Sequence, residues 1–216
     1  MNTRPSLCVI DLGRQAYASA LRIQEERAEA RKIGTVSDTL LLVEHEPVYT
    51  LGRNARESHV LASPAQLARE GIEVVRTGRG GDVTYHGPGQ LVGYPIIDLR
   101  AMGKGVLWYV GSLEQALIRV LADFGLAGAT DPVNRGVWIG RNKIAAIGVR
   151  VSRHITQHGF SLNVHTDLTY YRNIVPCGLP DRGVTSLHLL APSVSFDAVK
   201  ASVVRHFRQV LGYAED

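Results

Sequence analysis

Hydrophobic residues recur along this chain at two different spacings. Spacings of three and four residues predict an amphipathic helix over 106–124, whose apolar stripe is expected to face a sheet. The stripe is formed by Val106, Val110, Leu113, Leu117, Val120, Leu121 and Phe124. Caps and composition predict three further helices, over 14–32, over 63–71 with Ser63 as N-cap, and from Ser195 towards the C-terminus.

Short runs rich in β-branched and aromatic residues predict strands between these helices. Residues 6–13 are expected to form a buried strand with Cys8 in the core, and 39–52 a strand broken at Pro47. Other strands are predicted over 72–77, 83–86, 91–99 and, as an antiparallel meander, within 136–164. Because strands pair locally and helices separate groups of strands, we expect an α+β fold. The chain, residues 1–216, is predicted to be a single domain with a mixed, largely antiparallel β-sheet flanked by helices.

Composition narrows the class of protein. With 216 residues, 45% of them hydrophobic and 20% charged, the chain can bury a core without disulfides or structural metals. No apolar run approaches the length of a membrane span, and the apolar run near the N-terminus is too short for a signal peptide. The two cysteines lie far apart, outside any metal-binding spacing, which favours free thiols and a cytoplasmic location. The net charge of +4 does not indicate a nucleic-acid partner.

Residues 79–96, RGGDVTYHGPGQLVGYPI, combine five glycines and two prolines with strand-forming residues. Glycine allows a ligand or another backbone to come close, and proline stiffens a turn, so the stretch predicts a binding loop between strands. It completes neither of the common glycine-rich nucleotide motifs and does not open a helix. His154 and His158 are four residues apart, but in a strand-and-turn context, which favours a solvated hairpin over a metal site. We expect no metal and no cofactor.

Cys177 stands between Pro176 and Gly178 and is a candidate nucleophile, because these flanks place it at a turn where its sulfur can be exposed. The alternative is a buried structural cysteine. A cation about 4 Å away, at an effective dielectric near 20, is worth about 4 kcal/mol, or roughly three pKa units, and would ionise the thiol. Lys143 is the best-placed cation, since it begins the apolar run KIAAIGVRV, although it could simply cap a strand edge.

Four motifs together resemble the octanoyltransferase family of lipoate biosynthesis, also called lipoate-protein ligase B. They are EHEPVYTLGR, RGGDVTYHGPGQLVGYPI, KIAAIGVRV followed by QHGFSLNV, and IVPCGLPDRGVTS, and the resemblance extends from about Leu40 to Leu189. It implies a fold similar to the catalytic domains of lipoate- and biotin-protein ligases. It also implies Cys177 as the nucleophile and Lys143 as the residue that lowers the pKa of the thiol. Ser161 departs from the family pattern, where alanine is expected.

The resemblance implies transfer of an octanoyl group from octanoyl-acyl carrier protein to a lysine of a lipoyl domain, through an acyl-cysteine. Acceptors would be the lipoyl domains of 2-oxoacid dehydrogenase complexes and the glycine cleavage H protein. The implied substrate-contacting residues are Arg79, Gly80, Gly81, Asp82, Val83, Thr84, Tyr85, His86, Ala146, Ile147, Gly148, Gly159, Phe160 and Ser161. Small residues among them would leave room for the hydrocarbon chain, whose burial is worth roughly 5 kcal/mol.

Two other functions stay open at the level of sequence. An ATP-dependent lipoate or biotin ligase would bind a nucleotide at the glycine-rich loop and would not need Cys177. A non-catalytic module that binds a lipoyl or carrier domain would make Cys177 structural. Within the loop, His86 either positions substrate or only holds the loop by a hydrogen bond, and Arg79 and Asp82 either contact substrate or form an internal ion pair.

Overall fold

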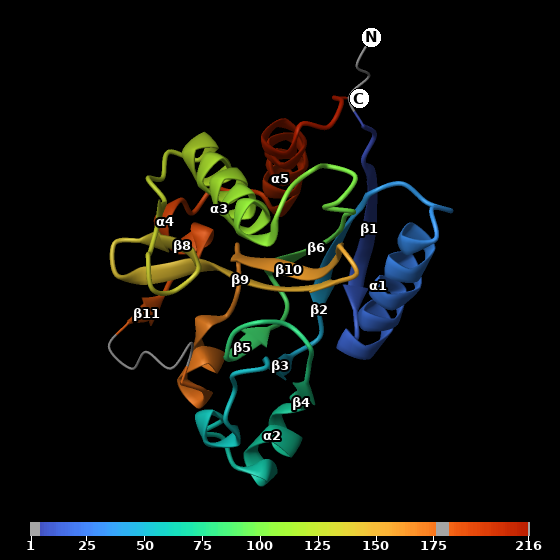
Figure 1. The fold of residues 1–216 in the computed structure, drawn as a ribbon. Coiled ribbons are helices and arrows are strands. Elements are labelled where there is room, and N and C mark those ends of the chain that lie inside the picture. Colours follow the sequence, from blue (N-terminus) through green and yellow to red (C-terminus); the bar gives the residue numbers. More distant parts are fainter. Residues whose placement is uncertain (1–4, 176–181, 216) are drawn as a thin grey trace.

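The computed structural model describes residues 5–175 and 182–215. Within these residues, eight strands form one large mixed sheet (Figure 1). In spatial order they are β1 (Cys8–Gln15), β2 (Thr39–His45), β6 (Gln90–Ile96), β10 (Ile155–Asn163), β9 (Asn142–Ser152), β8 (Gly136–Ile139) and β7 (Ala129–Thr130), with β11 (Gly183–Val184) also paired to β9. Only the β1–β2 and β9–β11 pairs are parallel, so the expected mixed, largely antiparallel sheet and its β8–β9–β10 meander are confirmed.

Helices cover both faces of the large sheet. The helices α3 (Val106–Asp123) and α5 (Phe196–Leu211) pack together on one face, and α1 (Tyr17–Lys32) lies against the other (Figure 1). Successive side chains of β2 point to opposite faces of the sheet, so the strand contributes to both layers. Leu40 and Leu42 join the core under α3, whereas Leu41 and Val43 face α1. Five residues of the predicted α3 stripe pack in or against this core: Leu113, Leu117, Val120, Leu121 and Phe124. Val110 is buried outside the core, and Val106 is exposed.

A second, three-stranded sheet was not expected from the sequence. It consists of β3 (Val48–Leu51) between β4 (Glu73–Arg76) and β5 (Val83–His86). The predicted strand over 39–52 is therefore two strands in different sheets, because Pro47 has no N–H to continue a ladder and the chain turns there. The same transfer happens in reverse at 87–89, where the glycine-rich stretch passes from β5 into β6 of the large sheet.

The shorter helices connect these sheets. They are α2 (Pro64–Glu70), α4 (Leu187–Leu190) and the 3₁₀ turns η1 (Glu57–His59) and η2 (Leu168–Asn173). The helix α2 is capped as predicted: the Ser63 hydroxyl accepts a hydrogen bond from the Gln66 amide, and Gly71 ends the helix with φ of 66°.

The interpretation of residues 6–13 as a buried strand is wrong. The strand β1 lies at the edge of the large sheet, carries a register shift between Asp11 and Arg14, and contains no buried residue. Leu7, just before it, takes the core position, whereas Cys8 is exposed. An edge strand has one paired neighbour, so less of its surface is covered than in the centre of a sheet.

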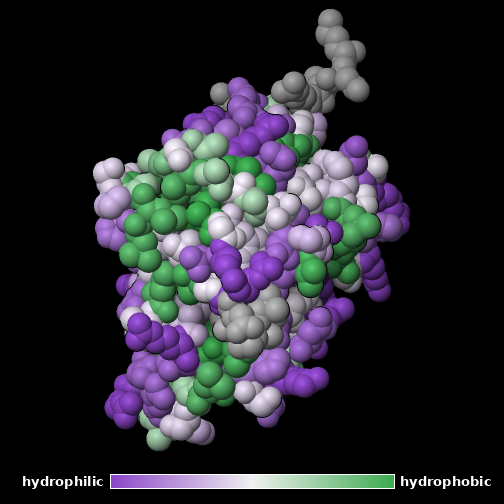
Figure 2. Space-filling view, turned by 90° about the vertical axis from the view of Figure 1, so that its left-hand side faces the viewer, coloured by the Kyte–Doolittle hydropathy of each residue, from purple (hydrophilic) through white to green (hydrophobic). Residues whose placement is uncertain are grey.

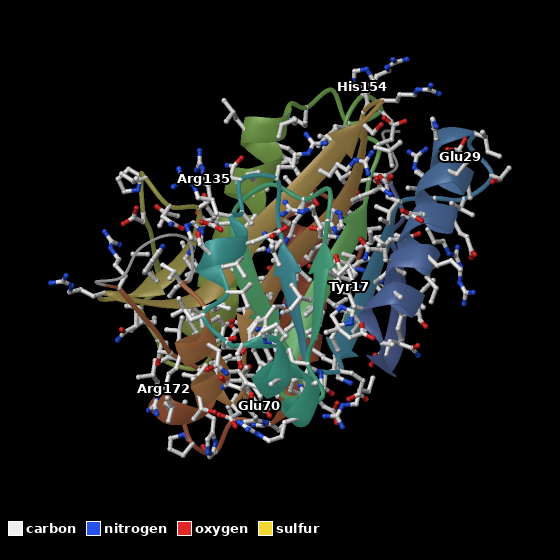
Figure 3. The ribbon with its side chains drawn as sticks, turned by 90° about the horizontal axis from the view of Figure 1, so that it is seen from below. Tyr17, Glu29, Glu70, Arg135, His154 and Arg172 are labelled. Carbon is white, nitrogen blue, oxygen red and sulfur yellow. The ribbon has the colours of Figure 1, made fainter. Side chains whose placement is uncertain are left out.

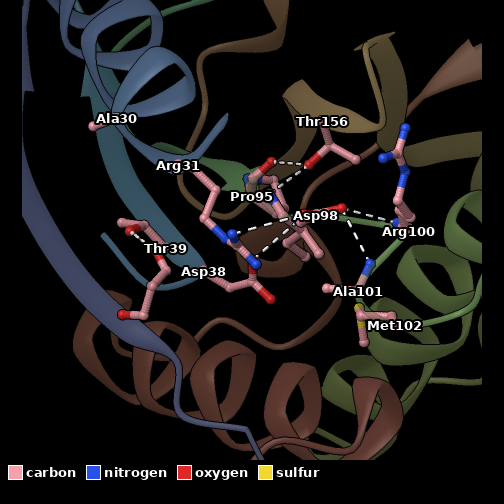
Figure 4. A network of polar contacts seen from close by, with 12 residues as sticks. Ala30, Arg31, Asp38, Thr39, Pro95, Asp98, Arg100, Ala101, Met102 and Thr156 are labelled. Carbon is pink, nitrogen blue, oxygen red and sulfur yellow. Dashed lines mark hydrogen bonds and ion pairs between the residues drawn. The ribbon is translucent and has the colours of Figure 1, made fainter. Parts of the chain in front are cut away.

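A buried polar network ties the ends of several elements together (Figure 4). The carboxylate of Asp38 accepts hydrogen bonds from the Arg31 guanidinium at 2.7 Å, from the Asp98 amide at 3.0 Å and from the Tyr213 hydroxyl at 2.9 Å. Arg31 ends α1, Asp98 follows β6 and Tyr213 follows α5. A single carboxylate therefore fixes three parts of the chain that are far apart in sequence.

Replacing Asp38 with alanine is expected to lower the free energy of unfolding by about 3–5 kcal/mol, because the Asp98 amide and the Tyr213 hydroxyl lose their acceptor and Arg31 keeps only its longer ion pair with Asp98, at 3.7 Å. Denaturant unfolding measures the change. The control is Asp197→Ala, which removes an exposed carboxylate and should change the free energy by less than about 1 kcal/mol. Equal stability of the two variants would contradict a structural role for the network.

Candidate active site

A cavity of about 520 Å³ lies where the large sheet meets the turn before β5, within the range of about 300–1,000 Å³ typical of ligand pockets. We call it the central cavity. Its wall includes Lys143 and every implied substrate-contacting residue except Tyr85. The remaining lining residues are Tyr17, Asn54, Val92, Tyr94, Val110, Val133, Asn134, Arg135, Val149 and His158.

The fold brings together the three sequence segments that the resemblance singled out. In the β9–β10 ladder, residues 146–148 pair directly with 159–161, Ala146 opposite Ser161 and Gly148 opposite Gly159. The turn over 79–82 lies against the same strand, since the Gly80 amide donates a hydrogen bond to the Val149 carbonyl at 2.9 Å. Segments up to eighty residues apart thus form one continuous wall.

Two of the glycines in this wall permit close approach of backbones. A Cβ at Gly148 would lie 2.8 Å from the Gly80 carbonyl oxygen, and a Cβ at Gly159 would overlap the Gly93 carbonyl. Sequence reasoning assigned the small residues of the wall to space for a hydrocarbon chain. The structure adds a second reason for glycine, which is the contact between β9 and the 79–82 turn.

Gly148→Ala is therefore expected to lower the free energy of unfolding by about 1–3 kcal/mol, the usual cost of overpacking. Gly111→Ala is the matched control, because it adds the same methyl group to α3 where nothing lies within 4 Å, and a helical Gly→Ala change is stabilising by up to about 1 kcal/mol. Thermal or denaturant unfolding compares the two. A stable Gly148→Ala protein would show that the turn and β9 are not in rigid contact.

Arg79 and Asp82 have separate partners that shape the turn. The buried guanidinium of Arg79 donates to the Thr50 carbonyl at 2.6 Å, to the Thr50 hydroxyl and to the Gly80 carbonyl. The Asp82 carboxylate contacts Nδ1 of His59 at 2.8 Å and accepts from the Val83 amide at 2.7 Å. The Asp82 carboxylate therefore contacts His59 and the adjacent backbone, and it does not form the internal ion pair with Arg79 that the sequence left open.

Aromatic and imidazole rings close one end of the central cavity. Tyr17, His86, Tyr94 and His158 all line it and are all buried. The His86 ring stacks on Tyr17 with centroids 6.4 Å apart, and its Nδ1 lies 2.7 Å from the Gln90 side-chain oxygen. Burial holds the pKa of His86 well below its usual value, and the nearby His45 acts in the same direction. His86 therefore stays neutral, holds the loop through Gln90 and also faces the cavity.

His158 corrects the expectation of a solvated hairpin. His154 is exposed, with φ of 70°, but His158 is only 4% exposed and lines the central cavity. Burial, followed by the charges of Arg79 and Arg150, lowers the pKa of His158 to about 4. The spacing of the two histidines did not predict this burial. The chain turns at His154, and the following strand β10 carries His158 into the interior.

Lys143 stands at the other end of the central cavity. It is 7% exposed, and its ammonium donates to the Asn134 side-chain oxygen and, at 3.1 Å, to the Arg135 carbonyl. The same ammonium lies 4.8 Å from the centre of the Trp138 ring, directly across the β8–β9 ladder. The expected packing of the Lys143 stem is confirmed, and its charge is held in one position by neighbouring groups.

The Lys143 end opens to solvent. Val133 is 88% exposed and the Arg135 side chain 52%, whereas the rings at the opposite end are buried. In the view from below, Arg135 and Tyr17 lie on opposite sides of the small sheet, and His154 lies far from both at the tip of the β9–β10 hairpin (Figure 3). The central cavity is thus a slot with an open, cationic end and a closed, aromatic end.

Tyr85 is the one implied contact that the structure places elsewhere. It is buried on the opposite side of β5 from its neighbours, where its ring packs against Tyr49, Tyr170 and Tyr171. The alternation of side chains along a strand explains this, because Thr84 and His86 face the cavity and the residue between them cannot.

Cys177 lies outside the described residues. The described chain enters that segment at Val175, whose amide donates to the His59 carbonyl at 2.8 Å. It continues after the segment at Arg182, whose guanidinium lies 4.8 Å from the centre of the Trp138 ring. The Lys143 ammonium contacts the same ring. The strand β11 then pairs with Asn142 and Lys143. The residue that follows the segment therefore shares a neighbour with Lys143.

Two features are absent from the described residues, a metal-binding cluster and a membrane-spanning helix. Across 5–175 and 182–215, no group of three histidine, cysteine or acidic side chains is placed to hold a metal ion. In the same residues, no helix combines the length and the apolar character needed to cross a membrane.

Comparison with known proteins defines the class. A family described as "Lipoyl protein ligase A/B catalytic domain" matches residues 16–208. The structure resembles a bi-partite lipoate protein ligase from Thermoplasma acidophilum, with a TM-score of 0.74 at 19% identity, covering 100% of this chain and 87% of that one. It also resembles biotin protein ligase from Aquifex aeolicus, with a TM-score of 0.55 at 13% identity, covering 97% and 70%. These likenesses establish the expected fold, that of lipoate- and biotin-ligase catalytic domains.

Sequence relatives narrow the class further. An octanoyltransferase from Solibacter usitatus is 53% identical over 206 residues, which cover 95% of this chain and 93% of the relative. An octanoyltransferase from Alkaliphilus metalliredigens is 48% identical, covering 96% of each chain. The chain belongs to the octanoyltransferase family, and it is an acyltransferase.

Proposed function

We propose that this enzyme transfers an octanoyl group from octanoyl-acyl carrier protein to a specific lysine of a lipoyl domain, through a thioester on Cys177. The observation that carries the proposal is the slot itself: a buried lysine at its open end, small residues along its walls and a closed end, in a chain about half identical to octanoyltransferases. Lipoyl domains of 2-oxoacid dehydrogenase complexes and the glycine cleavage H protein are the proposed acceptors.

In the first half-reaction, the Cys177 thiolate attacks the carbonyl carbon of the donor thioester. A new C–S bond forms to Cys177, the C–S bond to the carrier breaks, and the carrier thiolate leaves and takes up a proton from the Lys143 ammonium, which becomes a neutral amine. One thioester replaces another, so the step is nearly balanced in energy and requires no ATP. The nucleophile must be ionised, which is the role proposed for the Lys143 ammonium.

Lys143 suits this role because its neighbours fix it. The Asn134 side-chain oxygen and the Arg135 carbonyl accept two of its hydrogen bonds, and the Trp138 ring lies beneath its charge. A fixed ammonium loses little entropy on pairing with a thiolate, and with little water around it the attraction is stronger than at the surface. Arg182 lies against the same Trp138 ring at the end of the Cys177 segment, where it pairs with Asp131.

In the second half-reaction, the amine of the acceptor lysine attacks the acyl-cysteine. A C–N bond forms, the C–S bond to Cys177 breaks, and the sulfur regains its proton from the amine. The product amide is more stable than the thioester, so this step drives the overall transfer. We assign the proton transfer to Lys143, whose amine, left neutral by the first half-reaction, would accept the proton from the attacking amine and pass it to the sulfur. Return of that proton from the thiol to Lys143 restores the thiolate–ammonium pair.

The walls of the central cavity suit the hydrocarbon part of the substrate. Ala146, Gly148, Gly159 and Gly80 line the cavity with small side chains or none, along the paired strands β9 and β10 and the 79–82 turn. Burying six or seven methylene groups there is worth roughly 5 kcal/mol. That energy can hold the acyl group in place while two proteins exchange at the open end.

Protein partners would approach the surface around the open end. On the face shown in Figure 2, hydrophobic side chains gather in separate patches with hydrophilic ones between them. Near Lys143 the partly exposed Arg135 and Arg182 pair with Glu114 and Asp131, so it is the net charge of +4 of the whole chain that would speed encounter with acidic carrier and lipoyl domains. This proposal places the reaction in the cytoplasm, where both cysteines would stay reduced.

The test is a transfer assay with octanoyl-acyl carrier protein and an unmodified lipoyl domain, with and without ATP. We expect an octanoylated lipoyl domain, seen by intact mass, at the same rate in both conditions. Transfer that depends on ATP, or use of free octanoate with ATP, would support a ligase instead. Binding of the lipoyl domain without modification would support a non-catalytic module.

A further inference from the structure

His158 has an unusual environment for a buried histidine. It adopts φ of 55° within β10, a region that side chains other than glycine rarely enter, and such strain tends to persist at functional sites. Its backbone amide is held by the Gln24 side-chain oxygen at 3.0 Å, and its ring meets Tyr94 edge-on with centroids 6.4 Å apart. Its Nδ1 is buried and has no hydrogen-bond partner in the described part of the chain. A polar atom is thus held without a partner at the closed end of the central cavity.

The residue pairs along β9 and β10 give the distance along the strands between His158 and the Lys143 end of the central cavity. The Lys143 ammonium contacts the Arg135 carbonyl, and the next residue, Gly136, pairs with Ala146. The ammonium therefore lies near the level of the Ala146–Ser161 pair. His158 pairs with Val149, three residues further along β9, which corresponds to about 10 Å at roughly 3.3 Å per residue.

An extended eight-carbon chain has nearly the same length. With C–C bonds of about 1.5 Å and tetrahedral angles, its seven bonds span about 9 Å. An acyl group whose carbonyl reacts beside Lys143, as the proposed function requires, would end just before the ring of His158. Two further carbons would add about 2.5 Å and bring the chain into contact with that ring.

We propose that His158 forms a polar end wall that restricts the central cavity to acyl chains of about eight carbons. This inference rests on the proposed function for the position of the acyl carbonyl. The neutral imidazole has one donor and one acceptor nitrogen, which water or another polar group can satisfy when an octanoyl chain stops short of it. A longer chain would place methylene groups against these nitrogens and leave them without partners. The wall thus selects against longer chains by polarity as well as by size.

The experiment measures binding of octanoic and decanoic acid by calorimetry, to the wild-type protein and to His158→Phe. Phenylalanine keeps the ring but removes both nitrogens. We expect the wild type to bind octanoate at least about tenfold more tightly than decanoate. In His158→Phe the preference should disappear or reverse, because two more buried methylenes are then worth about tenfold in favour of decanoate. His154→Phe is the matched control, since it changes an exposed histidine that also has positive φ, and it should keep the wild-type ratio.

An unchanged ratio in His158→Phe would overturn the polar end wall and leave size as the only restriction. If His158→Phe does not fold, a second ligand tests the polar wall in the wild-type protein. Binding of 8-hydroxyoctanoic acid should stay within about threefold of octanoic acid, because its hydroxyl can pair with the imidazole, whereas a loss of about a hundredfold would mean an apolar wall. Failure of octanoyl transfer with retained chain-length preference would count against the proposed function alone.

Discussion

Replacing Cys177 with alanine is expected to lower octanoyl transfer by at least about a thousandfold, because the proposed route has no other group to carry the acyl chain. The rate is measured as octanoylated lipoyl domain formed at saturating donor. Cys8→Ala is the control: Cys8 is the other cysteine, exposed on the edge strand β1, and its loss should change the rate by less than about twofold.

Transfer by Cys177→Ala at more than about a tenth of the wild-type rate would show that the acyl group passes directly from carrier to lysine. A comparable loss in Cys8→Ala would instead indicate damage to the fold. Unfolding curves for both variants separate these cases, because a purely catalytic substitution leaves the midpoint unchanged.

The second large effect is expected for Lys143→Met, which keeps the apolar stem of the side chain and removes its charge. Without this cation the pKa of the Cys177 thiol should rise towards about 8.5, where only about 3% is ionised at pH 7. Labelling of Cys177 by iodoacetamide at pH 7 should then slow by about 30-fold. Transfer should fall further, by about 10²–10³, because the acceptor amine also loses its proton acceptor.

Lys104→Met is the matched control for this substitution. Lys104 also lies over an indole, with its ammonium 5.2 Å from the Trp108 ring, but it is exposed at the start of α3 and away from the central cavity. Labelling and transfer should stay within about twofold of wild type. A labelling rate that is unchanged in Lys143→Met, and that rises with pH as in the wild type, would reject the proposed ionisation of Cys177 by Lys143.

The ends of several helices could be predicted from the sequence, because residues at the ends themselves determine them. Ser63 and Gly71 delimit α2, and Ser195 caps α5, because side-chain caps and left-handed glycines act within a few residues. The small sheet could not be predicted in this way. Whether β3 continues β2 or leaves it depends on which strand pairs with each, and pairing is a long-range property.

The candidate site was predictable where a motif covers it. The resemblance selected residues 79–86, 146–148 and 159–161, and the cavity gathers all of them apart from Tyr85. It did not indicate Tyr17 at the start of α1, or Asn134 and Arg135 before β8, because these residues lie in stretches with no distinctive pattern and reach the cavity only through the tertiary fold. The spacing of His154 and His158 predicts a solvated hairpin, because it does not show that the strand after the turn carries His158 back into the protein.

The structure shows what the glycines of the 79–82 turn and of β9 contact. The sequence left open whether these glycines make room for a ligand or for another backbone. The contacts of Gly80 and Gly148 add that backbone meets backbone there, so the turn and β9 form one rigid wall. A rigid wall on one side and a fixed ammonium on the other would hold an acyl thioester without a nucleotide, even though the fold is shared with ligases whose structures were determined with ATP.

If Cys177 carries the octanoyl group, the acylated enzyme can be detected by its intact mass. After incubation with octanoyl-acyl carrier protein in the absence of a lipoyl domain, the wild-type chain should gain the mass of one octanoyl group. The adduct should disappear when an unmodified lipoyl domain is added, and it should be absent from Cys177→Ala. A wild-type chain that gains no mass, or a Cys177→Ala chain that gains the same mass, would contradict the account.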